Sequence, residues 1–277
     1  MTIGQPGYRW DHFVVLDCET IAPDADLDAG FPPWPQHEIV CTSLLLADRE
    51  RYNEWRFDLV TISGHSEDAI RRSDELIGQR TVVTLNGRAF DAPVLGMAAM
   101  RAQLFDCHDL ARFWSSPRFG PAHADLVELF GNYGAVRSGC SMKELSRALG
   151  VPAKVNCDGS DVASMVAAGE LEAVRAYCEQ DCVSTMWAWS SWAGLRQGDP
   201  AYHATLVSQF AEYVREAGHH HLTEFLHSPR AEELRRRSVQ AIAEAGAKAI
   251  ELRQHLNWVD PERFARVVEP AFEDFDA

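Results

Sequence analysis

The 277-residue sequence has no excess of positive charge and no long hydrophobic run. It has 26 lysines and arginines against 41 aspartates and glutamates, a net charge of −15 that repels nucleic acids and membrane surfaces at long range. A nucleic-acid partner would need bound cations or a local basic patch. No window reaches about 18 apolar residues without a charge, and Met1–Trp10 lacks the pattern of a secretory signal. We therefore expect a soluble, cytoplasmic protein without a membrane partner.

Cysteine pairs of the C-x-x-C type are also absent. The seven cysteines are an odd number scattered through apolar stretches, so a disulfide framework is not expected. Cys178 and Cys182 lie four residues apart, at a spacing that indicates packing on one helix face. The sequence therefore predicts free thiols in a reducing compartment.

The composition is that of a globular protein, with 46% hydrophobic and 24% charged residues. The length indicates about two structural units. The best linker candidate, Leu195–Pro200, divides the chain into residues 1–195 and a helical, alanine-rich extension of residues 196–277. The apolar stripe of this extension predicts packing on the first unit or on a second subunit, which would make a homo-oligomer.

Short apolar runs predict four strands before the first confident helix. These are His12–Cys18, Ile39–Leu46, Arg51–Phe57 and Thr81–Leu85, with a hairpin turn at Ala47–Glu50. The strands precede a series of helices, an order that favours an α/β fold with a mixed sheet flanked by helices.

Helical periodicity and capping signals appear in the rest of the chain. Ser141, followed three residues later by Glu144, is typical of a capping box. Leu104–Pro121 is expected to hold one more strand followed by a loop. The predicted helices are Ala92–Gln103, Ala124–Phe130, Ser141–Leu149, Glu170–Trp192, Ala204–Arg215 and Ala231–Leu256.

Acidic residues stand at the ends of these elements. Asp17 and Glu19 follow the first strand, and their two-residue spacing places both carboxylates on one side of the sheet. Asp91 follows the fourth strand just ahead of a helix, where it is also suited to be an N-cap. Tyr177 and Asp181 lie four residues apart on one helix face. Each residue alone also fits a structural role, but four carboxylates that converge would suit Mg²⁺ or Mn²⁺.

Three segments together resemble the exonuclease motifs of the DEDD superfamily, tyrosine subclass. The motifs are D-x-E-T at Asp17–Thr20, N-G-x-x-F-D at Asn86–Asp91 and Y-x-x-x-D at Tyr177–Asp181. With HADL, LGVPAK and DGS between them, the chain resembles more narrowly, over about His12–Trp192, the predicted stand-alone 3′ to 5′ exonucleases related to the proofreading domain of family B DNA polymerases.

The resemblance implies a ribonuclease H-like fold and hydrolysis of a nucleic acid from its free 3′ end with two metal ions. In that family pattern Asp17 would bridge both ions, Glu19 and Asp181 would complete the water-activating site, and Asp91 would support the second ion. Tyr177 would orient the attacking water. The resemblance favours single-stranded DNA over RNA as the substrate, with nucleoside monophosphates as products.

Further residues match positions that line the nucleotide pocket in the family. Thr20, Asn86 and Phe90 would contact the terminal nucleotides, although Phe90 also suits core packing. Arg88 and Lys154 would contact phosphate, or remain solvated. His123 and Asp125 also match the family pattern, and the sequence assigns them no role.

Two other functions remain open at this point. One is a non-catalytic nucleic-acid-binding or regulatory module on the same fold, and the other is a metal-dependent phosphohydrolase of small nucleotides. Outside the motifs, the run His219–His221 is not expected to supply three zinc ligands, because successive residues of a helix face different ways.

Overall fold

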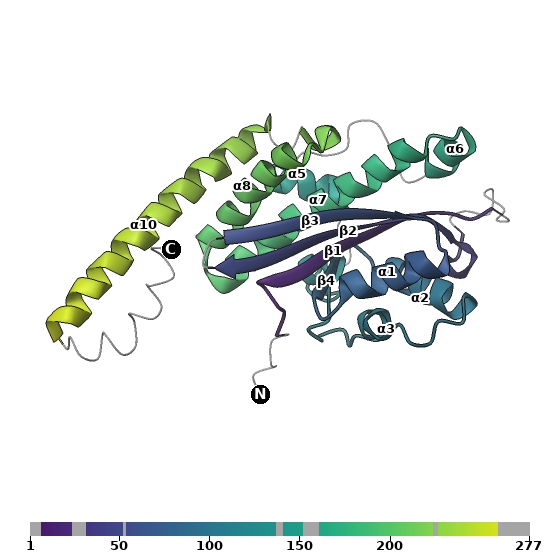
Figure 1. Cartoon of the computed structure of the whole chain (residues 1–277), viewed down its shortest axis with the longest axis horizontal. Helices are drawn as coiled ribbons and strands as arrows, with labels where there is room; N and C mark the ends of the chain where they lie inside the picture. The colour runs from purple at the N-terminus through teal and green to yellow at the C-terminus, as the bar shows by residue number, and fades with distance from the viewer. Residues whose placement is uncertain are drawn as a thin grey trace.

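The computed structural model describes residues 7–23, 32–51, 54–136, 141–151, 161–223 and 227–259. Within them, five strands form one mixed sheet in the order β3-β2-β1-β4-β5 (Figure 1). The strands are β1 His12–Ile21, β2 Glu38–Arg51, β3 Glu54–Ser63, β4 Thr81–Thr84 and β5 His123–Asp125. β2 runs antiparallel to β1 and β3, whereas β4 is parallel to both β1 and β5. This confirms the α/β, ribonuclease H-like sheet expected from the sequence.

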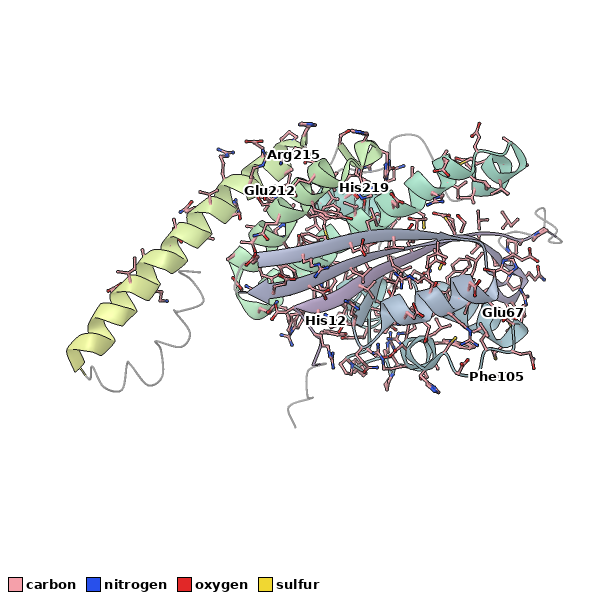
Figure 2. The ribbon with its side chains drawn as sticks, viewed as in Figure 1. His12, Glu67, Phe105, Glu212, Arg215 and His219 are labelled. Atoms are coloured by element: carbon pink, nitrogen blue, oxygen red, sulfur yellow. The ribbon has the colours of Figure 1, made fainter. Side chains whose placement is uncertain are left out.

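Helices cover both faces of the sheet, with α1, α2 and α3 below it in Figure 1 and α7 and α8 above it. Figure 2 shows the same division, since the labelled residues Glu67 and Phe105 lie on the opposite side of the sheet from Glu212 and His219. The helices are α1 Glu67–Ile77, α2 Asp91–Arg101, α3 His108–Trp114, α4 Leu126–Phe130, α5 Met142–Leu149, α6 Val162–Ala167, α7 Leu171–Gln197, α8 Pro200–Ala217 and α10 Pro229–Val259, with 3₁₀ turns η2 Trp34–Gln36 and η4 His220–Leu222.

The alternation of side chains along β1 divides the core into two parts. Phe13 and Val15 are fully buried on the face that packs against α7 and α8. Val14 and Leu16 are buried on the other face, against the layer of α1, α2 and α3. Asp17 and Glu19 continue the odd-numbered series, so the end of β1 directs both carboxylates toward α7.

Helix α8 packs against β3, the edge strand of the sheet. The backbone N–H of Trp55 donates to Gln209 Oε1 at 2.7 Å, and that of Leu59 donates to the Tyr213 hydroxyl at 2.9 Å. These two side chains accept from backbone N–H groups of β3, which is at the edge of the sheet and has a strand partner on one side only. Among the described helices, none has the length and hydropathy needed to cross a membrane.

Three local predictions were wrong. The hairpin turn does not lie at Ala47–Glu50, because β2 continues to Arg51 and pairs Ala47 with Phe57. The polar residues there are instead held in the sheet, for example by the ion pair of Arg49 with Asp11 at 3.0 Å. Leu104–Pro121 contains helix α3 instead of a strand, since Leu110 and Phe113 bury one helical face. The helix predicted at Ala124 begins only at Leu126, after β5.

Other elements agree with their patterns. Ser141 and Glu144 form the capping box of α5, with both reciprocal hydrogen bonds present. Helices α2, α7, α8 and α10 confirm four of the predicted helices, with bounds that differ by at most five residues. Helix α1 was not predicted, although Ser66 caps it and its first turn carries two acidic residues.

Candidate active site

Three predicted site residues, Asp17, Glu19 and Asp91, lie near the C-terminal part of β1, beyond the segment that pairs with β4. β4 pairs with β1 only along Phe13–Val15. Beyond that point, the side chain of Asp91, the first residue of α2, bonds to β1 in place of a strand. Its Oδ1 accepts a hydrogen bond from the Cys18 backbone N–H at 3.0 Å. Asp91 is thus the first helical residue and not the N-cap, a position that Phe90 occupies. The contact brings the second motif against the first.

Helix α7 supplies the third motif from above the sheet. Cys178 Sγ lies 3.3 Å from the Asp17 carbonyl oxygen and 3.4 Å from Asp17 Oδ2. Ligand atoms of Asp17, Glu19 and Cys178 all lie within 4.8 Å of one another. Cys182, one turn further along α7, reaches the carbonyl oxygen of Ser43 on β2 at 3.3 Å. Both thiols are buried, as expected for packing residues.

Carboxylates from all three motifs contribute to the electrostatics of the site. The pKa of Asp91 is raised to about 7, chiefly by burial and also by the negative charges of Asp125 and Asp181, against the lowering effect of backbone hydrogen bonds. Burial also raises the pKa of the Cys182 thiol, with additional contributions from Asp17, Asp181 and Asp91. The three aspartates of the three motifs therefore act on one small region of the interior.

This donor set fits a hard divalent cation. Asp17 and Glu19 offer carboxylate oxygens close together, and Asp91 is a buried carboxylate whose charged form is disfavoured in the metal-free protein. A divalent cation would offset that charge in a low-dielectric environment. Oxygen ligands of this kind suit Mg²⁺ or Mn²⁺ better than softer metals.

Asp125, to which the sequence assigned no role, holds the second motif in place. Its Oδ1 accepts from the backbone N–H groups of Asn86 at 3.0 Å and Val127 at 2.9 Å, and its Oδ2 accepts from that of Arg88 at 2.9 Å. Asn86 needs this support because its φ is +67°, in the left-handed region. Asp125 therefore positions the loop that leads to Asp91.

Close packing further constrains this loop. A Cβ on Gly87 would lie 2.5 Å from the Thr84 side chain, so only glycine fits there. Thr84 in turn lies 2.8 Å, Oγ1 to Nε2, from His123. Burial lowers the pKa of His123 well below its usual value, so this ring is neutral. His123 is thus a buried structural residue beneath the loop.

Asp125→Ala is expected to lower the free energy of unfolding by about 2–4 kcal/mol, because three backbone N–H groups lose their acceptor. The metal affinity of the site should fall as well, since the loop carries Asp91. Chemical denaturation and metal titration measure the two effects. As a control, Asp199→Ala removes an N-cap that serves only α8 and should leave metal affinity unchanged. Equal effects of the two variants on metal affinity would contradict the positioning role of Asp125.

The predicted nucleotide-pocket residues lie beside the carboxylates. Thr20 Oγ1 is 2.7 Å from His37 Nδ1, and the ring of Phe90 meets the His37 ring edge to face, with centroids 4.9 Å apart. His37 also lines a cavity of about 560 Å³ that includes Ile39, His65 and Arg101. His37 was not among the predicted site residues, although it contacts Thr20 of the first motif and Phe90 of the second.

The predicted phosphate contacts differ in their surroundings. The Arg88 guanidinium pairs with Glu128 at 2.9 Å and donates to the Ser116 carbonyl oxygen at 2.6 Å. A phosphate contact by Arg88 would have to replace these interactions, and it stays a prediction. Lys154 lies outside the described residues. Asn86 is exposed at the surface of its loop.

The sequence from residue 29 to 228 matches the family described as predicted 3′-5′ exonucleases related to the exonuclease domain of PolB. The chain belongs to this family. No curated protein matches the chain. The matched region contains Asn86–Asp91 and Tyr177–Asp181 and continues through α8, past Trp192. Asp17 and Glu19 precede the matched region, so the geometry described above is what connects them to the other two motifs. Membership in this exonuclease family supports nuclease chemistry on a nucleic-acid substrate.

Proposed function

We propose that the protein is a metal-dependent 3′ to 5′ exonuclease that removes nucleoside monophosphates from a nucleic acid, with single-stranded DNA preferred over RNA. The observation that carries the proposal is the convergence of Asp17, Glu19, Asp91 and Asp181 at the end of β1, in a chain of this exonuclease family. A purely nucleic-acid-binding module gains nothing from burying several carboxylates in one place, because each burial is costly without a cation.

The four carboxylates would hold two Mg²⁺ or Mn²⁺ ions, as the resemblance to the DEDD superfamily suggests. In such a pair the ions activate the attacking water and stabilise the charge on the leaving oxygen. Asp17 would contact both ions, Glu19 and Asp181 would complete the first ion's ligands, and Asp91 would serve the second. Hydrolysis adds one water across the terminal phosphodiester bond and leaves a strand shorter by one nucleotide.

Other side chains would position the strand and the water. Tyr177 lies one turn before Asp181 on α7, from which its hydroxyl would orient the attacking water. Thr20, Asn86 and Phe90 would contact the terminal nucleotides, with Phe90 offering a ring face for stacking on a base. Arg88 and Lys154 would contact phosphate. Bound cations at the carboxylates would also reduce the local repulsion between the acidic protein and a polyanion.

Incubation of the purified protein with 3′- or 5′-labelled single strands tests the proposal. With Mg²⁺ or Mn²⁺, a 5′ label should appear in a ladder of shortening strands and a 3′ label in mononucleotides, and EDTA should abolish both. Matched DNA and RNA strands then report the preferred sugar. Binding without any shortening would favour a regulatory module. Hydrolysis restricted to free nucleotides would favour a phosphohydrolase.

Tyr177→Phe is expected to lower the rate constant about 10- to 100-fold, because it removes one hydrogen bond to water and no metal ligand. Single-turnover kinetics measures the rate, and Mn²⁺ titration measures the metal affinity, which should not change. A loss of Mn²⁺ binding in this variant would show that Tyr177 supports the structure of the site and not the attacking water.

A further inference from the structure

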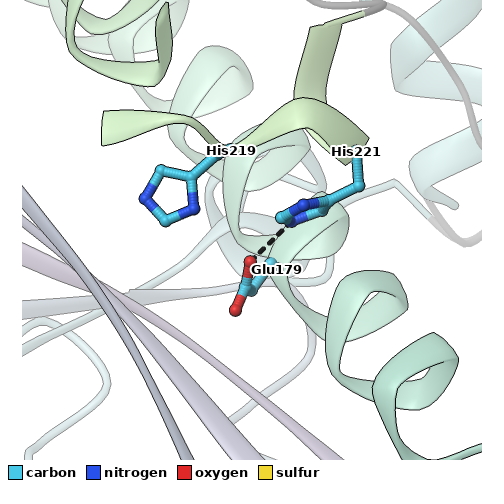
Figure 3. Close-up of side chains that lie close together, drawn as sticks. All are labelled: Glu179, His219 and His221. Atoms are coloured by element: carbon cyan, nitrogen blue, oxygen red, sulfur yellow. Dashed lines mark hydrogen bonds and ion pairs between the residues drawn. The ribbon is translucent and has the colours of Figure 1, made fainter. Parts of the chain in front are cut away.

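A second group of metal-ligating side chains lies where α7 meets the edge strand β3, at Glu179, which accepts a hydrogen bond from Thr61. Helix α8 ends at Gly218, whose φ of +76° reverses the chain. The following 3₁₀ turn η4 is anchored by Leu222, which is fully buried. This turn brings His219 and His221 back onto α7 next to Glu179 (Figure 3).

The three side chains point toward one another in Figure 3, and their ligand atoms all lie within 4.8 Å of one another. His221 Nε2 is 2.6 Å from Glu179 Oε2. The exposed residue His220, between the two histidines, is not part of this group. The run of three histidines therefore contributes only two members, and the third comes from a residue about 40 positions earlier in the chain.

We propose that Glu179, His219 and His221 form a Zn²⁺ site distinct from the catalytic carboxylates. Two imidazole nitrogens with one carboxylate are a ligand set typical of zinc, and nitrogen ligands favour zinc over Mg²⁺. Glu179 is buried, whereas the side chain of His221 is 31% exposed, so a water has access to the fourth coordination position.

Neighbouring residues orient the three ligands. Thr61 Oγ1 on β3 donates to Glu179 Oε1 at 2.5 Å, which leaves Oε2 directed at the histidines. The Tyr213 hydroxyl is 3.4 Å from His219 Nε2, so the other ring nitrogen is the one available to the ion. The amide of Gln180 donates to the His221 carbonyl oxygen at 3.3 Å and ties the turn to α7. Such outer contacts typically fix the orientation of metal ligands.

The distances require only a small adjustment. Tetrahedral zinc with bonds of about 2.0–2.1 Å places its ligand atoms about 3.3–3.4 Å apart. The Glu179–His221 pair would open from 2.6 Å, and the remaining separations would close from at most 4.8 Å. Side-chain rotations of about 1 Å achieve both changes. The bound ion would join η4 to the part of α7 that lies between Tyr177 and Asp181.

Calorimetric titration of the metal-stripped protein with Zn²⁺ alone, in excess Mg²⁺, tests the site. We expect one Zn²⁺ per chain, bound with a Kd in the micromolar range or below. The Tm should rise by about 5 °C or more at a free Zn²⁺ concentration about 100 times the Kd. His219→Gln should weaken binding at least 10-fold and abolish the shift in Tm. This variant keeps the Glu179–His221 hydrogen bond, so a failure to fold is not expected.

Two control variants make the result specific. His220→Gln removes the neighbouring exposed histidine and should bind Zn²⁺ as the unaltered protein does. Asp17→Asn removes a catalytic carboxylate and should also leave this binding intact. The proposal is overturned if His219→Gln binds Zn²⁺ as tightly as His220→Gln, or if Asp17→Asn is the variant that loses the ion. Neither readout depends on exonuclease activity.

Discussion

Asp17→Asn is expected to lower the exonuclease rate constant at least about 100-fold, equivalent to about 2.7 kcal/mol of barrier, while the protein stays folded. The variant removes a carboxylate that we place between both ions, so the whole metal pair is weakened. Its amide oxygen still accepts the Cys178 thiol hydrogen. Single-turnover kinetics at saturating Mg²⁺ and circular dichroism measure the two outcomes.

Asp11→Asn is the matched control for this variant. Asp11 directly precedes β1, its side chain is 59% exposed, and it pairs with Arg49 outside the site. The control removes the same charge six residues upstream and should keep its full rate. If Asp17→Asn keeps more than about one tenth of the rate constant of the unaltered protein, a loss of less than roughly 1.4 kcal/mol of barrier, Asp17 does not have the bridging role.

Asp91→Asn is expected to stabilise the metal-free protein at alkaline pH. The pKa of Asp91 is 3.8 in the unfolded chain and about 7 in the folded one, so the folded state retains the proton more strongly. Stability therefore falls as pH rises from about 4 to about 7, where folding has to bury a charged carboxylate. The asparagine variant lacks this penalty and keeps an oxygen that accepts from Cys18.

Unfolding by urea in EDTA at pH 5 and pH 8 measures this effect. The advantage of Asp91→Asn over the unaltered protein should grow by about 2–3 kcal/mol between these two pH values. Saturating Mg²⁺ should reduce the advantage, because the ion stabilises the charged form in the unaltered protein. Glu54→Gln, at an exposed position of β3, should show no such pH dependence. An advantage that is the same at both pH values would contradict the burial of a titrating Asp91.

The parts of the site that follow local periodicity could be predicted from the sequence. Asp17 and Glu19 share one side of β1 because strand side chains alternate, and Tyr177 and Asp181 share one face of α7 because of the helical repeat. Both patterns need only a few neighbouring residues. They are therefore visible without knowledge of the sheet order.

The role of Asp125 could not be predicted in this way. Its carboxylate reaches the backbone of Asn86 and Arg88 only because β5 lies next to β4, with Asp125 paired with Thr84. That neighbourhood depends on strand order, which no local pattern specifies. The Glu179 group depends similarly on the chain reversal at Gly218.

The misplaced hairpin turn and the missed helix α3 have a common cause. Asp48, Arg49 and Glu50 are polar enough to indicate a turn, but tertiary ion pairs hold Asp48 and Arg49 within the long hairpin. In α3, only Leu110 and Phe113 are buried. Contacts with other elements determine the secondary structure of both segments and outweigh their local propensity.

The position of α7 late in the chain bears on the order in which the molecule assembles. The contact between Cys178 and Asp17 spans 161 residues, whereas β1, β2 and β3 pair with their neighbours in the sequence. Closing so long a loop is slow compared with forming a hairpin. During synthesis, β1 emerges well before α7 exists. The face of β1 that packs against α7 in the folded protein is not covered by this helix until then. The proposed metal site needs Asp181 from α7, so a nascent chain would have no complete nuclease centre until α7 has docked.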